Sequence, residues 1–200
     1  IDFAGIPMNQ IMLMAIEEIN AAGGLLGKKL KGVVYDPQTK MPLYSQYATQ
    51  LALKDRASVV MGGITSASRE TIRPILHRYK TLYFYNTLYE GGVCDRNEIS
   101  LGTTPAQTVE KLVPYTMGLW GKKVYTIAAD YNYGQITAAW VKRYVEQNGG
   151  EVVSTDFFPL DVTNFGPTIS KIQSAKPDMV MSVLVGTGHL GFYNQWAAAG

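Results

Sequence analysis

Three hydroxyl side chains follow a pair of glycines in the segment MGGITSASRETIRPIL, residues 61–76. The glycines allow a tight turn, and a serine can cap the helix that begins there, either Ser66 or Ser68. A hydroxyl that is not used for capping faces the positive end of the helix dipole, beside free backbone N–H groups. This chemistry suits a carboxylate, a carbonyl oxygen or another small acceptor, and the alternative is a capped helix with solvated hydroxyls. The candidate binding residues are Thr65, Ser66, Ala67 and Ser68.

Three more apolar segments end in residues that can line a binding site. An amide and hydroxyls follow LYFY, an acid and tyrosines follow KVYTIAA, and a glycine and a threonine follow MVMSVLV. A tyrosine offers a flat apolar face and an OH group, which together can close over a small polar ligand. Ordinary surface loops with buried tyrosines would give the same composition. The candidates are Tyr85, Asn86, Thr87, Asp130, Tyr131, Tyr133, Gly186 and Thr187.

Signatures of catalysis, cofactor binding and metal binding are missing from the sequence. It contains no G-x-S-x-G, H-E-x-x-H, Walker A or G-x-G-x-x-G motif. Asp130 and His189 are the only titratable candidates at the predicted site turns, and no nucleophile accompanies them. One cysteine, Cys94, and two histidines do not make a zinc site. We therefore expect no catalytic residue, no cofactor and no metal.

The elements that position these turns alternate between helical and strand patterns. Helical periodicity predicts helices over residues 10–22, 43–54, 107–120, 134–148, 165–175 and 190–199, and one from the capping serine to about residue 79. Apolar runs predict strands over residues 30–35, 57–61, 82–85, 98–102, 123–128, 151–157 and 179–185. This alternation predicts an α/β fold with parallel sheets built from βαβ units, whose ligands bind at the carboxyl ends of the strands.

One irregular segment divides the chain. Residues 89–105 are rich in Gly, Asn, Asp and Thr, which is typical of a crossover between two lobes. We predict an N-terminal lobe over residues 1–102, a second lobe over residues 103–200, a ligand cleft between them and a hinge near residues 101–105. The first predicted helix has no strand before it and the last has none after it, so we expect the chain to be truncated at both ends.

Composition excludes several classes of partner. Hydrophobic residues make up 46% and charged residues 17% of the 200 residues, as in ordinary globular proteins. A net charge of +2 without a dense Lys/Arg run argues against nucleic-acid binding. Since no apolar stretch reaches the roughly 18 residues of a membrane span, we expect no membrane insertion. The chain starts at Ile1, which leaves room for an export signal that has been removed.

Five segments resemble type I periplasmic binding proteins of ABC importers, most closely the urea and short-chain-amide branch that includes the amide-sensing regulator. The resemblance covers nearly the whole chain, and its TSASR and YEG pieces are fairly specific. The segments are AIEEINAAGGLLGKKL, GGITSASRETIRPIL, FYNTLYEG, ADYNYG and VLVGTGHLGFYNQWAAAG.

This resemblance implies a fold, a location and partners. Two doubly wound parallel-sheet lobes would close over a small polar solute, in the periplasm or on the cell exterior, and would deliver it to an importer permease. Ser66 and its neighbouring backbone would bind the polar group of the solute, Tyr85 and Thr87 would line the first lobe, and Tyr131 and Tyr133 would close from the second. We expect a monomer or weak dimer.

Three departures from the family pattern bear on the ligand. Ile64 replaces an aromatic residue, Asn86 replaces a proline, and Gly134 replaces a second proline, as in the branched-chain amino acid binders. Asn86, Thr87 and the tyrosines favour urea or a short-chain amide. The alternatives are an aliphatic amino acid, with Asp130 as partner of its ammonium group, or a ligand-sensing regulator domain.

Overall fold

The chain folds into two compact units. The computed structural model describes residues 2–200, so the first residue of the first predicted lobe lies outside the described part. The first unit comprises Ile1–Thr87 and Val93–Gly102, and the second comprises Leu88–Gly92 and Thr103–Gly200. The chain therefore enters the second unit briefly at Leu88–Gly92 before it returns to complete the first.

A parallel sheet forms the centre of the first unit. Strand β2 lies in the middle and pairs with β1 on one side and β3 on the other, with Tyr83 opposite both Val60 and Glu98. Helices α2 and α3 contact each other, and their apolar residues Ala48, Ile72 and Leu76 share one core cluster with the tyrosines of β2. The elements are α1 (Asp2–Ala21), α2 (Met41–Leu53), β1 (Val59–Met61), α3 (Ser66–Arg78), β2 (Leu82–Tyr85) and β3 (Glu98–Ser100).

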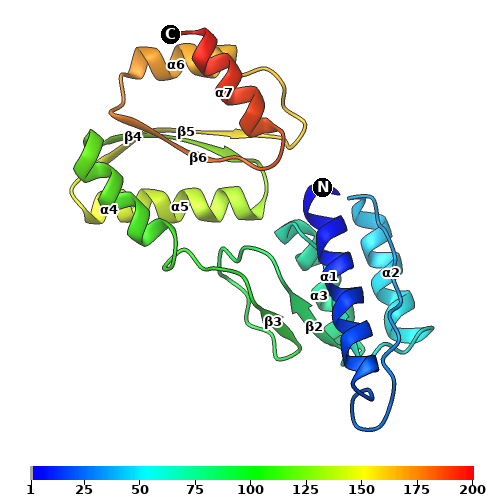
Figure 1. The fold of residues 1–200 in the computed structure, drawn as a ribbon. Helices are drawn as coiled ribbons and strands as arrows, with labels where there is room; N and C mark the ends of the chain where they lie inside the picture. The colour runs from blue at the N-terminus through cyan, green and yellow to red at the C-terminus, as the bar shows by residue number, and fades with distance from the viewer. Residues whose placement is uncertain (1) are drawn as a thin grey trace. The chain divides into compact units, whose positions relative to one another are not determined.

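The second unit has a parallel sheet with helices on both faces. Strand β4 lies between β5 and β6, and Figure 1 shows α4 and α5 on one face of this sheet and α6 and α7 on the other. The elements are α4 (Val109–Trp120), β4 (Lys123–Ala129), α5 (Asn132–Gln147), β5 (Glu151–Phe158), α6 (Gly166–Ala175), β6 (Met179–Val183) and α7 (Gly188–Ala198).

Strand alternation explains the two-sided core of this second unit. Val124 and Ala128 belong to the core cluster shared with α4 and α5, whereas Tyr125 and Ile127 belong to the cluster shared with α6 and α7. Successive side chains of a strand point to opposite faces, so a central strand covered on both sides is mostly apolar, with Thr126 as the buried polar exception in β4. The predicted α/β fold with parallel sheets is confirmed.

One predicted strand is wrong. Residues 30–35 form no strand, although LKGVVY is as apolar as the strands that do form. Asn20 holds this segment beside α1, because its side chain donates to Leu30 O (2.8 Å) and accepts from Leu30 N (2.7 Å). No described residue pairs with the segment along its length, and Val33 and Val34 stay exposed. A strand needs a neighbouring strand for its backbone hydrogen bonds, which an apolar run alone does not supply.

The first helix begins earlier than predicted. It starts at Asp2 rather than at Gln10, and it continues through Pro7. Pro7 is the sixth residue of this helix, so its missing N–H leaves one intrahelical hydrogen bond unmade. Ile11 and Met14, on the predicted apolar face, are exposed. Across residues 2–200, no helix is both long and apolar enough to span a bilayer.

Candidate functional site

The turn between β1 and α3 is capped by Thr65, not by Ser66 or Ser68 as predicted. Thr65 has an extended backbone (φ −84°, ψ 147°), and its Oγ1 accepts a hydrogen bond from Ser68 N at 3.1 Å. Ser68 is already helical, and its own hydroxyl donates to Thr65 O at 2.6 Å. The cap must have a non-helical backbone, and consecutive hydroxyl residues do not reveal which of them adopts it.

Capping by Thr65 leaves the Ser66 hydroxyl unused. Ser66 is 1% exposed, and its Oγ has no hydrogen-bond partner among the described residues. Ser66 and Ala67 occupy the first two helical positions, where backbone N–H groups have no acceptor inside the helix. A buried hydroxyl without a partner is unfavourable, which makes Ser66 Oγ a candidate hydrogen-bonding group of this helix end.

The turn after β2 lies against the same segment. Tyr85 OH donates to Ile64 O at 2.7 Å, and Thr87 Oγ1 donates to the same carbonyl oxygen at 2.9 Å. Between them, Asn86 Oδ1 is buried without a hydrogen-bond partner in the described part of the chain. The structure therefore brings together the predicted candidates of the first unit, from Thr65 to Ser68 and from Tyr85 to Thr87.

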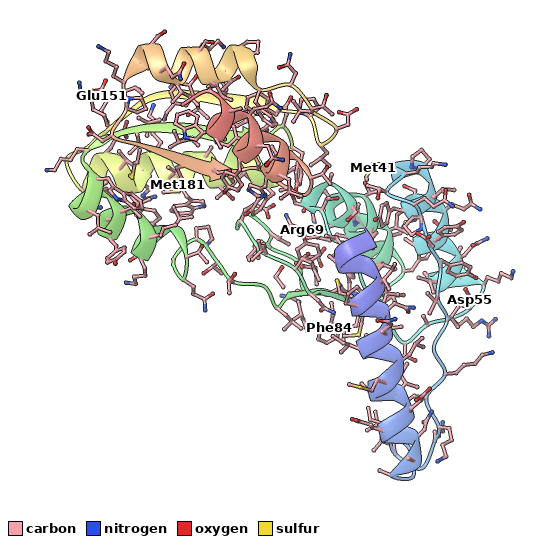
Figure 2. All side chains as sticks on the ribbon, turned by 45° about the horizontal axis from the view of Figure 1, so that its top comes forward. Met41, Asp55, Arg69, Phe84, Glu151 and Met181 are labelled. Carbon is pink, nitrogen blue, oxygen red and sulfur yellow. The ribbon has the colours of Figure 1, made fainter. Side chains whose placement is uncertain are left out.

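Tyr83 and Arg69 also belong to this region and were not among the sequence candidates. Tyr83 OH donates to Gly62 O at 2.9 Å, and burial raises the pKa of this phenol far above its usual value. Arg69, which projects from α3 (Figure 2), is 2% exposed and its guanidinium lies 4.9 Å from the centre of the Tyr85 ring. The signal for Tyr83 was present, since Tyr83, Tyr85 and Thr87 alternate along one strand.

Gly63 is required where these groups converge. Its φ of +73° is in the left-handed region, and an added Cβ would lie 3.0 Å from both Ser68 Oγ and Tyr83 OH. A side chain would therefore be strained by the backbone and would also displace two hydrogen-bonding groups. The expectation that glycine allows the backbone to turn tightly here agrees with this geometry.

The turn after β4 holds three candidates of the second unit. Asp130 is exposed; its N–H donates to Phe158 O at 2.6 Å and its Oδ1 accepts from Gln135 Nε2 at 3.0 Å. Tyr131 precedes the first residue of α5, and its ring lies 6.1 Å from that of Tyr133. The two rings form a tilted pair beside the exposed carboxylate.

The turn after β6 lies at the same edge of the second sheet, because β4 and β6 are parallel neighbours. Gly186 has a φ of +71°, and Thr187 is exposed and does not cap α7 with its side chain. The His189 ring stacks on Tyr193 at 5.9 Å, and burial lowers the pKa of this imidazole. In the part of the chain that the structure describes, Asp130 and His189 share no hydrogen bond or ion pair.

A cavity of about 180 Å³ lies inside the second unit between α4, α5, β6 and the short segment Leu88–Gly92. Glu90 and Tyr133 line it, and Trp140 Nε1 donates to Glu90 O at 3.1 Å. Burial and the nearby Glu90 raise the pKa of the Tyr133 phenol. Glu90 is 1% exposed and was not a sequence candidate, although it stands in the quoted segment FYNTLYEG.

Residues 2–200 contain no cluster of three or more His, Cys, Asp or Glu side chains that could hold a metal ion. The first unit instead gathers hydrogen-bonding groups at the N-terminus of α3.

Comparison with known proteins gives a family and a set of similar folds. The family profile described as "Periplasmic binding protein domain" matches residues 3–200. A leucine-, isoleucine-, valine-, threonine- and alanine-binding protein of Pseudomonas aeruginosa is 25% identical over 169 residues, which cover 82% of this chain and 44% of that protein.

Two solved structures illustrate the fold. The leucine-, isoleucine-, valine-, threonine- and alanine-binding protein of Brucella ovis, in its closed conformation, superposes with a TM-score of 0.84 at 23% identity, covering 99% of this chain and 54% of that one. A solute-binding protein of an ABC transporter from R. palustris, in complex with benzoate, gives a TM-score of 0.77 at 21% identity. The match covers 90% of this chain and 52% of that one. The chain thus has the type I periplasmic binding protein fold and spans about half the length of these relatives.

Proposed function

The chain belongs to the periplasmic binding protein domain family, and from that premise we propose that it captures a small carboxylate, in the first place an aliphatic α-amino acid, for an ABC importer. The observation that carries this proposal is the buried, unpartnered Ser66 hydroxyl at the N-terminus of α3. The protein would work outside the cytoplasm and hand its ligand to a permease. Asp130, Tyr131, Tyr133, Gly186 and Thr187 would add contacts from the second unit.

The α3 end of the site offers donors to the ligand. The N–H groups of Ser66 and Ala67 and the Ser66 hydroxyl can all donate, whereas the carbonyl of Ile64 already accepts two hydrogen bonds. Donors at the positive end of a helix dipole favour a negatively charged acceptor such as a carboxylate.

The β2 end of the site offers acceptors. The proton of the Thr87 hydroxyl is committed to Ile64 O, so its oxygen can only accept a further hydrogen bond. Asn86 Oδ1 is a second acceptor, buried and unpartnered among the described residues. Because the donors and the acceptors meet in one unit, they match the two charged groups of an α-amino acid.

The ligands named for the relatives are in keeping with this assignment. The P. aeruginosa and B. ovis proteins are named for amino acids, and the R. palustris protein was solved with benzoate. Each of these ligands carries a carboxylate, and only the amino acids carry an ammonium group as well. The carboxylate, which all of these ligands share, is the group that we assign to the N-terminus of α3.

Urea or a short-chain amide is the second candidate. The same donors would bind the carbonyl oxygen of an amide, and Asn86 Oδ1 and Thr87 Oγ1 would accept from its NH₂ group. The two candidates differ in charge, because a neutral amide gains less from the helix dipole than a carboxylate does.

Titration calorimetry with matched acid and amide pairs tests the proposal. We expect isoleucine and benzoate to bind more tightly than isoleucinamide and benzamide, and urea and acetamide to bind weakly. Tighter binding of the amides or of urea would transfer the assignment to the second candidate. If no compound of either class binds, the proposed ligand chemistry is wrong.

A serine variant ties the binding to α3. Ser66→Ala removes a hydroxyl that has no partner in the ligand-free chain, so the melting temperature should stay the same or rise. Affinity for the carboxylate should fall by about 10- to 100-fold, since a hydrogen bond to a charged group contributes about 1.5–3 kcal/mol. Ser170→Ala, on α6, is the control for affinity: its hydroxyl donates to Gly166 O at 3.2 Å, far along the chain from the candidate residues of the first unit, and its removal should leave the affinity unchanged. Unchanged affinity in Ser66→Ala would exclude this helix end as the carboxylate site.

A further inference from the structure

Three hydroxyls from one side of β2 and its extension hold the backbone of the β1–α3 turn. Tyr83 and Tyr85 are two residues apart on β2, so their side chains point to the same face of the strand, and Thr87 lies in the turn that follows. Tyr83 OH donates to Gly62 O at 2.9 Å, and Tyr85 OH and Thr87 Oγ1 both donate to Ile64 O, at 2.7 and 2.9 Å. The hydroxyls therefore fix two alternate carbonyl groups of the turn.

The surroundings of Tyr85 separate it from the ligand. Its side chain is 1% exposed, its OH group is directed at Ile64 O, and the Arg69 guanidinium lies over its ring. A carbonyl oxygen has two lone pairs, and Tyr85 and Thr87 together occupy both on Ile64. The turn is thereby held on one side by β2 and on the other by the helix cap at Thr65.

We propose that Tyr85, which the sequence predicts as a ligand-lining residue, is a positioning residue that holds residues 62–65 in the ligand-binding conformation without touching the ligand. This inference rests on the proposed function, because the groups that it positions are the Ser66 hydroxyl and the first N–H groups of α3. A preorganised turn raises affinity, since a ligand bound to a partly populated conformation loses affinity in proportion to that population.

The hydroxyl of Tyr85 is tested by Tyr85→Phe, which keeps the ring and removes only the donor. We expect the affinities for isoleucine and for benzoate to fall by the same factor, about three- to tenfold for one lost hydrogen bond. If the affinity falls by different factors for the two ligands, Tyr85 contacts the ligand directly and the proposal is wrong. Unchanged affinities would also contradict the proposal. Tyr79→Phe, at the other end of α3, is the matched control and should bind both ligands like the original protein.

The shared carbonyl gives a second, sharper measurement. In Tyr85→Phe or Thr87→Val alone, Ile64 O keeps one donor, whereas the double variant leaves it with neither. The loss of benzoate affinity in the double variant should therefore exceed the product of the two single losses. Losses that simply multiply would show that the two hydroxyls act independently, against the proposal.

Hydrogen exchange in the ligand-free protein separates the two proposals. Amide protons of residues 64–67 should exchange faster in Tyr85→Phe than in the original protein, whatever the ligand proves to be. If they do so while no carboxylate binds, the positioning role stands and the proposed ligand fails. Unchanged exchange would refute the positioning role. Should Tyr85→Phe not fold, Tyr83→Phe takes its place, with faster exchange at residues 62–65 expected and unchanged exchange contradicting the proposal.

Discussion

The two units hold the same kind of strand-to-helix turn in different ways. In the first, Gly62 N donates to Phe84 O at 3.3 Å, and side-chain hydroxyls of β2 and of Thr87 add hydrogen bonds to the turn carbonyls of Gly62 and Ile64. In the second, the backbone holds the turn: Asp130 N donates to Phe158 O, and Tyr131 N donates to Ala129 O at 3.0 Å.

This difference has a consequence for the side chains. In the second unit, the Asp130 carboxylate is exposed, and the rings of Tyr131 and Tyr133 form a tilted pair with centres 6.1 Å apart. In the first unit, side-chain hydrogen bonds restrain the turn that precedes Ser66. The Ser66 hydroxyl is buried there and has no hydrogen-bond partner among the described residues. A turn held by strand hydroxyls suits a fixed part of a binding site, and a turn held by its backbone suits adaptable contacts.

The largest loss of stability is expected from a substitution in the turn between β4 and α5. Gly134 is buried in the first turn of α5, and a Cβ there would collide with the carbonyl of Ala129. Because the obstacle is backbone, Gly134→Ala should lower the free energy of unfolding by about 3 kcal/mol. Thermal unfolding followed by tryptophan fluorescence measures this, since all three tryptophans lie in the second unit.

Gly118→Ala provides the control for this substitution. Gly118 is an exposed glycine of α4 with open space around its Cβ position, and alanine should stabilise the helix by up to about 1 kcal/mol. Equal effects of the two substitutions would contradict the packing that we describe for Gly134.

A smaller loss is expected from the corresponding glycine of the hydroxyl-held turn. Gly63→Ala meets a strained φ and two side-chain oxygens, which can shift more readily than backbone can. We expect a loss of about 2 kcal/mol, together with weaker carboxylate binding in calorimetry. Full affinity in a folded Gly63→Ala protein would mean that the turn need not be held rigidly.

Acid should weaken the first unit through Asp95. This carboxylate is 2% exposed and accepts from Asn97 N (2.9 Å), His77 Nδ1 (2.8 Å) and Arg73 Nη1 (3.2 Å). Burial opposes ionisation, but these hydrogen bonds outweigh it and hold the pKa of Asp95 below its ordinary value of 3.8. A lowered folded-state pKa means that the stabilisation is complete above pH 3.8 and is lost as the pH falls through the folded value.

The measurement compares two signals during acid titration. Circular dichroism reports both units, whereas tryptophan fluorescence reports the second alone. Below about pH 4 we expect ellipticity to change before fluorescence does, and Asp95→Asn should weaken this pH dependence. Simultaneous loss of both signals would argue against a local role for Asp95.

The smallest effect concerns the segment that crosses into the second unit. Trp140→Phe removes the donor to Glu90 O, and we expect a loss of about 1 kcal/mol. Proteolysis should then cut within Leu88–Gly92 more readily than in the original protein, which gel analysis of the fragments detects. Trp120→Phe is the control, since Trp120 is 62% exposed. Equal protease sensitivity in both variants would exclude an anchoring role for Trp140.

Most elements could be predicted because their patterns are local. The predicted strand over residues 82–85 coincides with β2, and the helix predicted to end near Tyr79 ends at Arg78 as α3. The strand prediction over residues 30–35 was wrong because a strand needs a neighbouring strand to pair with, and no described residue pairs with that apolar run. The start of α1 was missed because its apolar period was recognised only from Gln10 onward, whereas the helix begins at Asp2.

The candidate site, too, could be predicted only in part. The position of the first-unit site, at the ends of β1 and β2, followed from the rule that ligands bind at the carboxyl ends of parallel strands. The roles of its hydroxyls did not, because Thr65, Ser66 and Ser68 are chemically alike and differ only in backbone angle and surroundings. For the same reason, Tyr85 could be predicted as part of the site but not as a donor to Ile64 O.

The sequence by itself determined an α/β fold, the places where its strands end and the residue types gathered there, because periodicity and turn chemistry act over a few neighbours. Only the tertiary structure decided which hydroxyls of the β1–α3 turn are satisfied by the protein and that the one on Ser66 has no partner among the described residues. Hydrogen-bond partners such as Tyr85 and Ile64 are 21 residues apart. Their pairing depends on how strands lie side by side, which no local pattern encodes.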